Sequence, residues 1–182
     1  MPRKLFTVAL LAMVMVMSVL VAPSQAAVPS KKKWLKDTRS AMVGSRAYVN
    51  KRVKQGGTRL AVNLDIDNTM IASAYGGGPV GPTLAFAARA RAEGMAVFVN
   101  TARLNKRRAE TREQLAAAGY VVDRLCMRRA KEAVKAGKVR CRTSFAALGY
   151  TLVANVGNNR TDFQGGGYEV AYRLPNYGGR LS

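Results

Sequence analysis

Two aspartates stand two residues apart at the end of an apolar run. Asp65 and Asp67 follow residues 60–64, Leu-Ala-Val-Asn-Leu, a pattern typical of a buried strand whose carboxyl end reaches a ligand-binding rim. On an extended segment their side chains point to the same side and repel each other unless a cation or a shared proton lies between them. The pattern indicates a divalent-cation site or a nucleophile paired with an acid/base group. A solvated turn is the plainer alternative, because Asp and Asn favour turns.

The composition narrows the chemistry that these residues can do. The 182-residue chain has no histidine, which excludes Ser-His, Cys-His and histidine-metal sites. Carboxylate, lysine and hydroxyl chemistry remains.

The N-terminus has the pattern of a signal peptide. Arg3 and Lys4 precede an almost wholly apolar stretch, residues 5–22, and Ser24 and Ala26 supply small residues at the positions that a signal peptidase reads. We expect cleavage after Ala26, a secreted protein and no membrane contact after cleavage. A retained membrane anchor is the alternative, because the apolar stretch is nearly long enough to span a bilayer.

The rest of the chain, residues 27–182, has the length of one domain. Helical and strand patterns alternate along it, which predicts an α/β fold with a mainly parallel sheet and a helical lead-in. The expected helices cover residues 31–55, 83–93, 106–118 and 139–148, and the expected strands cover residues 60–64, 95–100, 120–122, 152–156 and 168–172. Three of these strands end in polar clusters that could converge on one crevice.

The two cysteines and the charge bear on environment and partners. In an exported protein, Cys126 and Cys141 suggest a disulfide that closes a loop of about 16 residues. The formal net charge of +20 favours anionic partners such as phosphorylated molecules, nucleic acid or an acidic cell surface. The basic residues are dispersed, and no nucleic-acid motif with interleaved aromatic residues accompanies them. A basic exported protein that binds nucleic acid or acidic cell-wall polymer remains one hypothesis.

Four ordered motifs resemble those of the haloacid-dehalogenase (HAD) superfamily. They are Asp65-Ile66-Asp67-Asn68-Thr69, Thr101 after an apolar strand, Lys138 eleven residues before Gly149, and Gly157-x-x-x-x-Asp162. The likeness is greatest to secreted acid phosphatases of the class B bacterial and plant vegetative-storage type. It implies a HAD-like Rossmannoid three-layer α/β/α fold. A glycine-rich loop and one helix separate the first two motifs, which is too little for a cap domain and predicts an open site.

The resemblance implies a role for each motif residue. Asp65 would attack phosphorus, and Asp67, with a raised pKa, would protonate the leaving oxygen and later activate water. Thr101 and Lys138 would bind the phosphoryl oxygens, with Asn100 beside them as a further substrate-binding candidate. The implied Mg²⁺ ligands are Asp65, Asp67, Asn158 and Asp162.

Each assignment has a structural alternative. Thr101 could cap the next helix, Lys138 could be one of many solvated lysines, and Asp162 could be an ordinary turn carboxylate. Tyr75 is a candidate platform for an aromatic or nucleoside leaving group, or it packs against its loop.

Asn158 departs from the family pattern, in which an aspartate is common. An amide oxygen brings no charge, so we expect weaker Mg²⁺ binding, and a phosphate-binding or storage-like protein without turnover is an alternative. Retention of both Asp65 and Asp67 argues against that alternative. The sequence thus predicts a secreted Mg²⁺-dependent acid phosphatase of broad specificity for small phosphomonoesters, with nucleotides among the candidate substrates.

Overall fold

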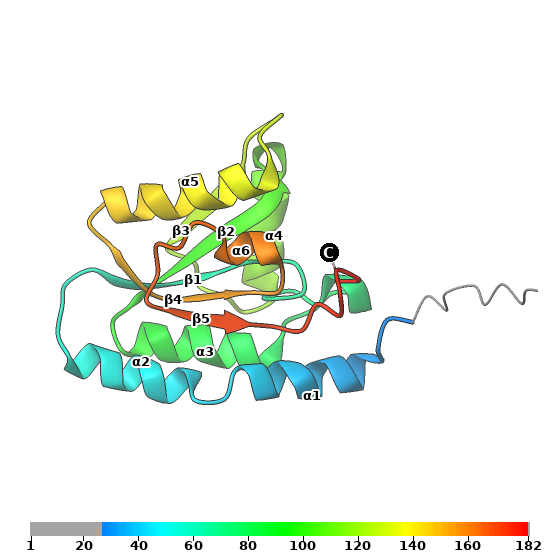
Figure 1. The fold of residues 1–182 in the computed structure, drawn as a ribbon, viewed down its shortest axis with the longest axis horizontal. Coiled ribbons are helices and arrows are strands. Elements are labelled where there is room, and N and C mark those ends of the chain that lie inside the picture. The colour runs from blue at the N-terminus through cyan, green and yellow to red at the C-terminus, as the bar shows by residue number, and fades with distance from the viewer. Residues whose placement is uncertain (1–26, 182) are drawn as a thin grey trace, which may run out of the picture.

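The computed structural model describes residues 27–181, and the fold is shown in Figure 1. The predicted signal peptide, residues 1–26, lies outside the described residues. Within residues 27–181, no helix is both long enough and apolar enough to cross a membrane.

Five parallel strands form one sheet in the order β3-β2-β1-β4-β5. The strands are β1 (Leu60–Leu64), β2 (Ala96–Leu104), β3 (Arg124–Arg128), β4 (Thr151–Gly157) and β5 (Val170–Arg173). All five residues of β1 are buried, as expected for the central strand of a sheet covered on both faces. The chain proceeds outward from β1 in one direction through β2 and β3, and in the other through β4 and β5. The crevice beside β1 and β4 is therefore the point where strand order reverses, the usual ligand position in such sheets.

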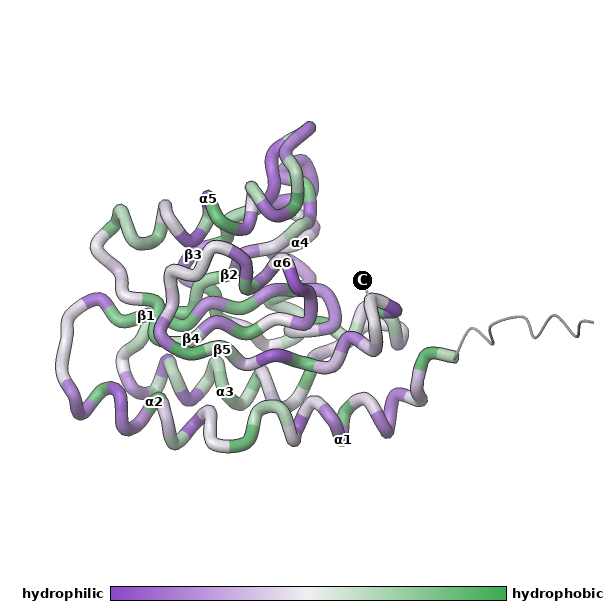
Figure 2. Tube along the Cα trace, viewed as in Figure 1, coloured by the Kyte–Doolittle hydropathy of each residue, from purple (hydrophilic) through white to green (hydrophobic). Residues whose placement is uncertain are grey.

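The helices include two short 3₁₀ turns. They are α1 (Lys31–Ala41), α2 (Ser45–Lys54), η1 (Ser73–Tyr75), α3 (Gly81–Ala92), η2 (Asn105–Arg107), α4 (Arg108–Ala117), α5 (Val134–Ala147) and α6 (Arg160–Phe163). The predicted lead-in is thus two helices, α1 and α2, and Figure 2 shows hydrophilic residues recurring along both.

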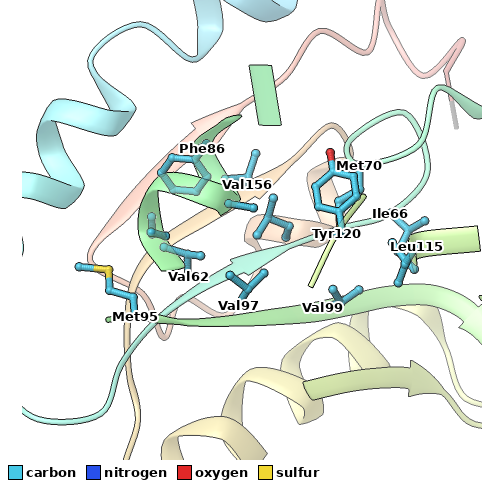
Figure 3. Packing of buried hydrophobic residues seen from close by; sticks show 14 of the residues in the cluster. Val62, Ile66, Met70, Phe86, Met95, Val97, Val99, Leu115, Tyr120 and Val156 are labelled. Carbon is cyan, nitrogen blue, oxygen red and sulfur yellow. The ribbon is translucent and has the colours of Figure 1, made fainter. Parts of the chain in front are cut away.

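Alternate residues of β1 and β2 enter two hydrophobic clusters on opposite faces of the sheet. Val62 and Val97 pack in the same cluster as Phe86 of α3 (Figure 3). Phe98 faces the other way and packs against Phe145 of α5, with the two rings tilted by 39° and their centroids 4.5 Å apart. Figure 1 accordingly shows α5 on one side of the sheet and α2 and α3 on the other. The predicted three-layer α/β fold is confirmed.

The predicted third strand, residues 120–122, is wrong, because β3 begins four residues later. The Tyr120 hydroxyl lies 3.0 Å from Thr83 Oγ1 in the core, and Asp123 accepts the Val97 N–H at 2.7 Å. These contacts make the apolar stretch a connection that turns into the sheet. The strand that follows, Arg-Leu-Cys-Met-Arg, alternates exposed and buried side chains as an edge strand does.

Other boundaries shift in ways that affect the site. The strand predicted to stop at residue 100 continues through Thr101 to Leu104, and the helix predicted to begin at residue 139 begins at Val134. Lys138 therefore lies in the second turn of α5. The helix predicted to begin at residue 83 begins at Gly81, so Thr83 lies in its first turn, and the Thr83 hydroxyl donates to Thr69 O at 2.6 Å.

Candidate active site

A cleft of about 620 Å³ opens beyond the carboxyl ends of β1 and β4. It contains predicted site residues from three separate parts of the chain together with one arginine that the sequence did not single out. These lining residues are Asp65, Asp67, Lys138, Asp162 and Arg180.

A buried lysine joins two buried carboxylates at the floor of this cleft. Lys138 Nζ donates to Asp65 Oδ1, lies 2.7 Å from Asp162 Oδ1 and donates to Asn100 O at 2.7 Å. Lys138, Asp65 and Asp162 are each at most 5 % exposed. Charges of this burial are retained only when paired, so the three groups act as one unit.

The electrostatics of this unit favour a protonated lysine. Burial disfavours the ammonium group, but the carboxylates of Asp65 and Asp162 outweigh it and hold the pKa of Lys138 above its usual value. Burial also raises the pKa of Asp65 to about 7, with Asp162 adding to the rise and Lys138 opposing it. Asp65 is thus a poorly solvated carboxyl group whose charge depends on the cation beside it.

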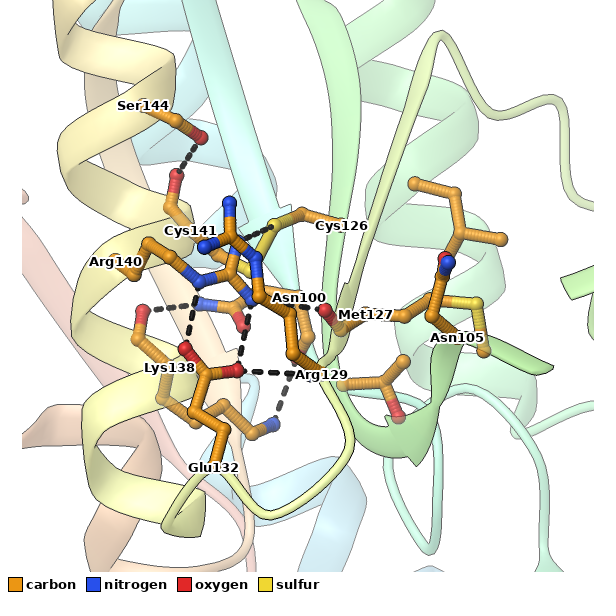
Figure 4. Close-up of a disulfide and its surroundings, with 12 residues drawn as sticks. Asn100, Asn105, Cys126, Met127, Arg129, Glu132, Lys138, Arg140, Cys141 and Ser144 are labelled. Atoms are coloured by element: carbon orange, nitrogen blue, oxygen red, sulfur yellow. Dashed lines mark hydrogen bonds and ion pairs between the residues drawn. A yellow bond between two sulfur atoms is a disulfide. The ribbon is translucent and has the colours of Figure 1, made fainter. Parts of the chain in front are cut away.

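Asn100 and a disulfide position Lys138. The Asn100 amide donates to Lys138 O at 2.8 Å, so this side chain supports the lysine rather than entering the cleft. Cys126 of β3 and Cys141 of α5 form a disulfide one turn along the helix from Lys138 (Figure 4). The predicted disulfide is confirmed, and it ties the edge of the sheet to the helix that carries the lysine.

Asp162 is held by both of its oxygens. Oδ1 pairs with Lys138, and Oδ2 accepts the Asn159 N–H at 2.8 Å in a capping box at the start of α6. A side chain on Gly157 would come within 2.3 Å of Asp162 Oδ2, so only glycine fits at that position. The carboxylate of Asp162 therefore serves first as the partner of Lys138.

Asp67 lies beside this unit and is held by an arginine fork. Arg103 donates through Nε to Asp67 Oδ2 at 2.9 Å and through a terminal nitrogen to Oδ1 at 2.7 Å, while the Ser73 hydroxyl donates to Oδ1 at 2.5 Å. Burial would raise the pKa of Asp67, but Arg103 and Ser73 together lower it below its ordinary value. The expectation of a raised pKa at Asp67 is wrong for this conformation.

Thr101 and Tyr75 are not among the side chains that line the cleft. Thr101 is 2 % exposed in β2, and its Oγ1 accepts the Arg103 N–H at 3.2 Å, so it caps no helix. The Tyr75 ring stacks on Trp34 at 4.8 Å, and its hydroxyl donates to Pro29 O at 2.9 Å. Tyr75 is therefore packed, as the alternative expected, but against Trp34 and Pro29 rather than against its own loop.

Asn158 lies next to the unit, buried and fully engaged. Its amide nitrogen donates to Leu181 O at 2.9 Å, and its amide oxygen accepts from Asn159 Nδ2 at 3.1 Å. No group of three His, Cys, Asp or Glu side chains suited to a metal occurs within residues 27–181, because position 158 is an amide and Asp67 faces Arg103. The candidate ligand atoms at this place are the carboxylate oxygens of Asp65 and Asp162 and the amide oxygen of Asn158, the type of ligand that Mg²⁺ prefers, with one carboxylate fewer than the family pattern. The residues present thus fit a weakened Mg²⁺ site.

Sequence reasoning missed Arg103, Ser73, Asn68 and Arg180. Arg103 follows Thr101 by two residues, and Asn68 lies inside the first motif, so position alone could have suggested both. Ser73 and Arg180 carry no such indication, because loops and the C-terminal turn bring them to the cleft.

Comparisons with known proteins bear on the family of the chain. The family model described as HAD superfamily, subfamily IIIB (Acid phosphatase) matches residues 73–180, more than half of the chain. That range includes Lys138 and Asp162 and begins after Asp65 and Asp67. No curated protein matches the chain.

Two solved structures have a similar fold. They are the class C acid phosphatase from Bacillus anthracis, with a TM-score of 0.69, and a Bacillus anthracis class C acid phosphatase with tungstate bound, with a TM-score of 0.67. Each is 13 % identical in sequence, and the similarity covers 81 % of this chain and 80 % of the other. The resemblance inferred from the four motifs is confirmed: the chain belongs to the HAD superfamily, subfamily IIIB, and is an acid phosphatase that acts on phosphomonoesters.

Proposed function

We propose that the chain is an exported Mg²⁺-dependent acid phosphatase that works through an aspartyl-phosphate on Asp65. The observation that carries this proposal is the buried unit of Asp65, Lys138 and Asp162 at the carboxyl end of β1. A purely structural ion pair would not have to lie at the floor of a 620 Å³ cleft. Paired charges there suit a reaction that adds and removes negative charge.

In the first half-reaction Asp65 attacks the phosphorus atom. A bond forms between a carboxylate oxygen of Asp65 and phosphorus while the bond from phosphorus to the leaving oxygen breaks, and the leaving alcohol takes a proton. Lys138 remains charged and offsets the negative charge on the equatorial oxygens. Water then attacks phosphorus, and Asp65 and inorganic phosphate are released.

Asp67 is the proposed acid and base of these two steps. Its carboxylate form, stabilised by Arg103 and Ser73, suits the second step, in which it accepts a proton from water. In the first step it must carry a proton, so the fork of Arg103 has to loosen or rearrange as substrate binds.

The proposed Mg²⁺ ligands are Asp65, the main chain at Asp67 and the amide oxygen of Asn158. Asp162, which is paired with Lys138, is the fourth residue of the proposed metal site. When bound, Mg²⁺ supplies positive charge that offsets the charge of the phosphoryl group. Because Asn158 replaces a carboxylate, half-maximal activity should need more Mg²⁺ than in a site with aspartate there.

A second cavity gives the leaving group a place. It measures about 500 Å³ and shares Asp67 and Ser73 with the first, and its other walls include residues 76–78, Arg103 and Gln114. Glycines have no side chains that could select a leaving group by its shape. We therefore propose broad specificity for small phosphomonoesters, nucleotides among them. This cavity replaces Tyr75 as the proposed leaving-group site.

Export is proposed from the N-terminal sequence, with residues 1–26 removed and residues 27–182 forming one phosphatase domain. The disulfide between Cys126 and Cys141 supports an oxidising location.

Hydrolysis of an aryl phosphate tests the proposal. The chain from residue 27 onward should release product in a Mg²⁺-dependent manner, and Asp65→Asn should reduce kcat by at least about 10³-fold without loss of folding. Arg112→Gln, on the exposed face of α4, is the matched control and should keep full activity. A folded wild-type protein without turnover at saturating Mg²⁺ would favour the phosphate-binding alternative.

A further inference from the structure

A turn at residues 176–181 closes on the active site. Residues 176–181, here called the C-terminal hook, bring Leu181 O within 2.9 Å of both Asn68 Nδ2 and Asn158 Nδ2. One carbonyl oxygen thus accepts two side-chain N–H groups, one from the loop after β1 and one from the loop after β4. Figure 1 shows this red segment at the end of the sheet toward which the β5 arrow points.

The hook is anchored at both of its ends. The Leu181 side chain is 1 % exposed in a cluster with Trp34 and Val80. Asn176 accepts the Leu181 N–H at 3.2 Å and donates to Asn159 Oδ1 at 2.9 Å. The reversal between these anchors uses Gly178 and Gly179 at φ 72° and 90°, which glycine adopts without strain.

Arg180 is the residue that this reversal directs to the cleft. It lines the cleft with Asp65 and Lys138, and its Nε donates to Tyr177 O at 2.7 Å, which fixes the base of the guanidinium group. Among the lining carboxylates, Asp67 is paired with Arg103, whereas Asp65 and Asp162 share the single cation of Lys138. Arg180 adds positive charge where a phosphate dianion has to enter. An arginine fork matches the geometry of phosphate oxygens.

We propose that the C-terminal hook is a positioning element of the active site and that Arg180 binds an anionic oxygen of the phosphate ester. The inference rests on the proposed phosphatase function and adds a substrate-binding residue outside the four motifs.

The hook also gives a physical reason for asparagine at position 158. An amide can donate to Leu181 O, whereas an aspartate carboxylate would place one acceptor against another. The same holds for Asn68, whose oxygen accepts the Ala74 N–H at 2.8 Å while its nitrogen holds the hook. The amide at 158 therefore serves the hook at the cost of a charged metal ligand.

Arg180→Gln tests the proposed contact, with Arg180→Lys as the conservative variant and Arg112→Gln as the control. For an aryl phosphate, KM should rise about tenfold in Arg180→Gln with kcat within about twofold of wild type, and Arg180→Lys should recover part of the loss. Inorganic phosphate should raise the Tm of wild type and of Arg112→Gln more than that of Arg180→Gln. Equal KM values, or equal phosphate-induced shifts, would overturn the proposal. The thermal shift does not depend on turnover, so it decides the role of Arg180 even if the phosphatase mechanism fails.

Asn68→Asp tests the positioning role without altering a proposed metal ligand. It keeps the acceptor for Ala74 and removes one donor to Leu181, so carboxypeptidase should release the C-terminal residues faster than from wild type. The KM for aryl phosphate should rise in parallel, and combining Asn68→Asp with Arg180→Gln should add little further. A loosened C-terminus with an unchanged KM would show that the hook is structural only.

Discussion

Replacing Lys138 with methionine removes the cation that lies between two buried carboxylates. Methionine keeps a similar length and apolar stem, so the change is mainly one of charge. Asp65 and Asp162 are 5 % and 3 % exposed, so a charge left on either side chain is poorly solvated. Truncation of one partner of such a buried pair costs about 3–5 kcal/mol, because the remaining charge is left uncompensated. For a chain of this length, that loss corresponds to a fall in Tm of about 6–20 °C.

The loss of stability in Lys138→Met should depend on pH and on whether Asp65 can still carry a charge. Without Lys138 the pKa of Asp65 rises further above its ordinary value, so the folded variant binds more protons than the unfolded chain at neutral pH. Stability then increases as the pH falls, and the difference between wild type and variant should shrink from pH 8 to pH 5. Adding Asp65→Asn to Lys138→Met should restore part of the stability, because it removes one of the two buried carboxylates that have lost their cation.

Urea denaturation of wild type, Lys138→Met, Asp65→Asn and the double variant, in EDTA, measures these differences. A loss below about 1 kcal/mol for Lys138→Met, or strictly additive effects in the double variant, would refute the view that Asp65, Lys138 and Asp162 form one buried unit.

Three further predictions follow from the same contacts. Replacing both Cys126 and Cys141 with serine should lower the free energy of unfolding by about 3 kcal/mol, because the disulfide closes a loop with a sequence separation of 15; an equal unfolding midpoint with and without reductant would contradict this. Arg103→Gln should lower kcat about 10–100-fold with Tm nearly unchanged, because Asp67 loses its two-point support, and an unchanged kcat would show that this support is unimportant. Glu132→Gln should destabilise the protein at pH 6 and have no effect near pH 2. The hydrogen bonds that Glu132 accepts, above all from the Arg140 side chain, lower its pKa to about 2. The stability that Glu132 contributes is therefore fully present above its ordinary pKa of 4.5 and is lost as the pH falls through about 2. Denaturation curves of wild type and variant that differ equally at both pH values would contradict this.

The sequence was informative where local pattern and chemistry coincide. The run at residues 60–64 followed by Asp65 and Asp67 predicts a strand and a site together, because a central strand is apolar until it reaches the rim. Lys138 could be singled out only by its register to Gly149, since the helix that carries it begins earlier than its apolar pattern indicates.

Long-range contacts were beyond the reach of the sequence. Residues 120–122 look like a strand, but contacts with Thr83 and Val97 make them a connection, and the strand is the arginine-flanked segment after them. The arginine fork on Asp67 reverses the expected direction of its pKa shift and depends on a contact across 36 residues. The hook brings the Leu181 carbonyl to the amide of Asn68, 113 residues away in the sequence, and no local sequence pattern predicts such a contact.

The central claim is that Asp65 becomes phosphorylated during turnover, and trapping that species tests it most directly. The Asp67→Asn variant lacks the group that activates water, whereas an aryl oxide leaves with little need for the proton that Asp67 would give. The phosphorylated enzyme should therefore accumulate after mixing with an aryl phosphate and Mg²⁺. Acid quenching and mass spectrometry should find one phosphoryl group on the peptide that contains Asp65, and none in Asp65→Asn. A phosphoryl group on another residue, or sustained turnover by Asp65→Asn, would contradict the account.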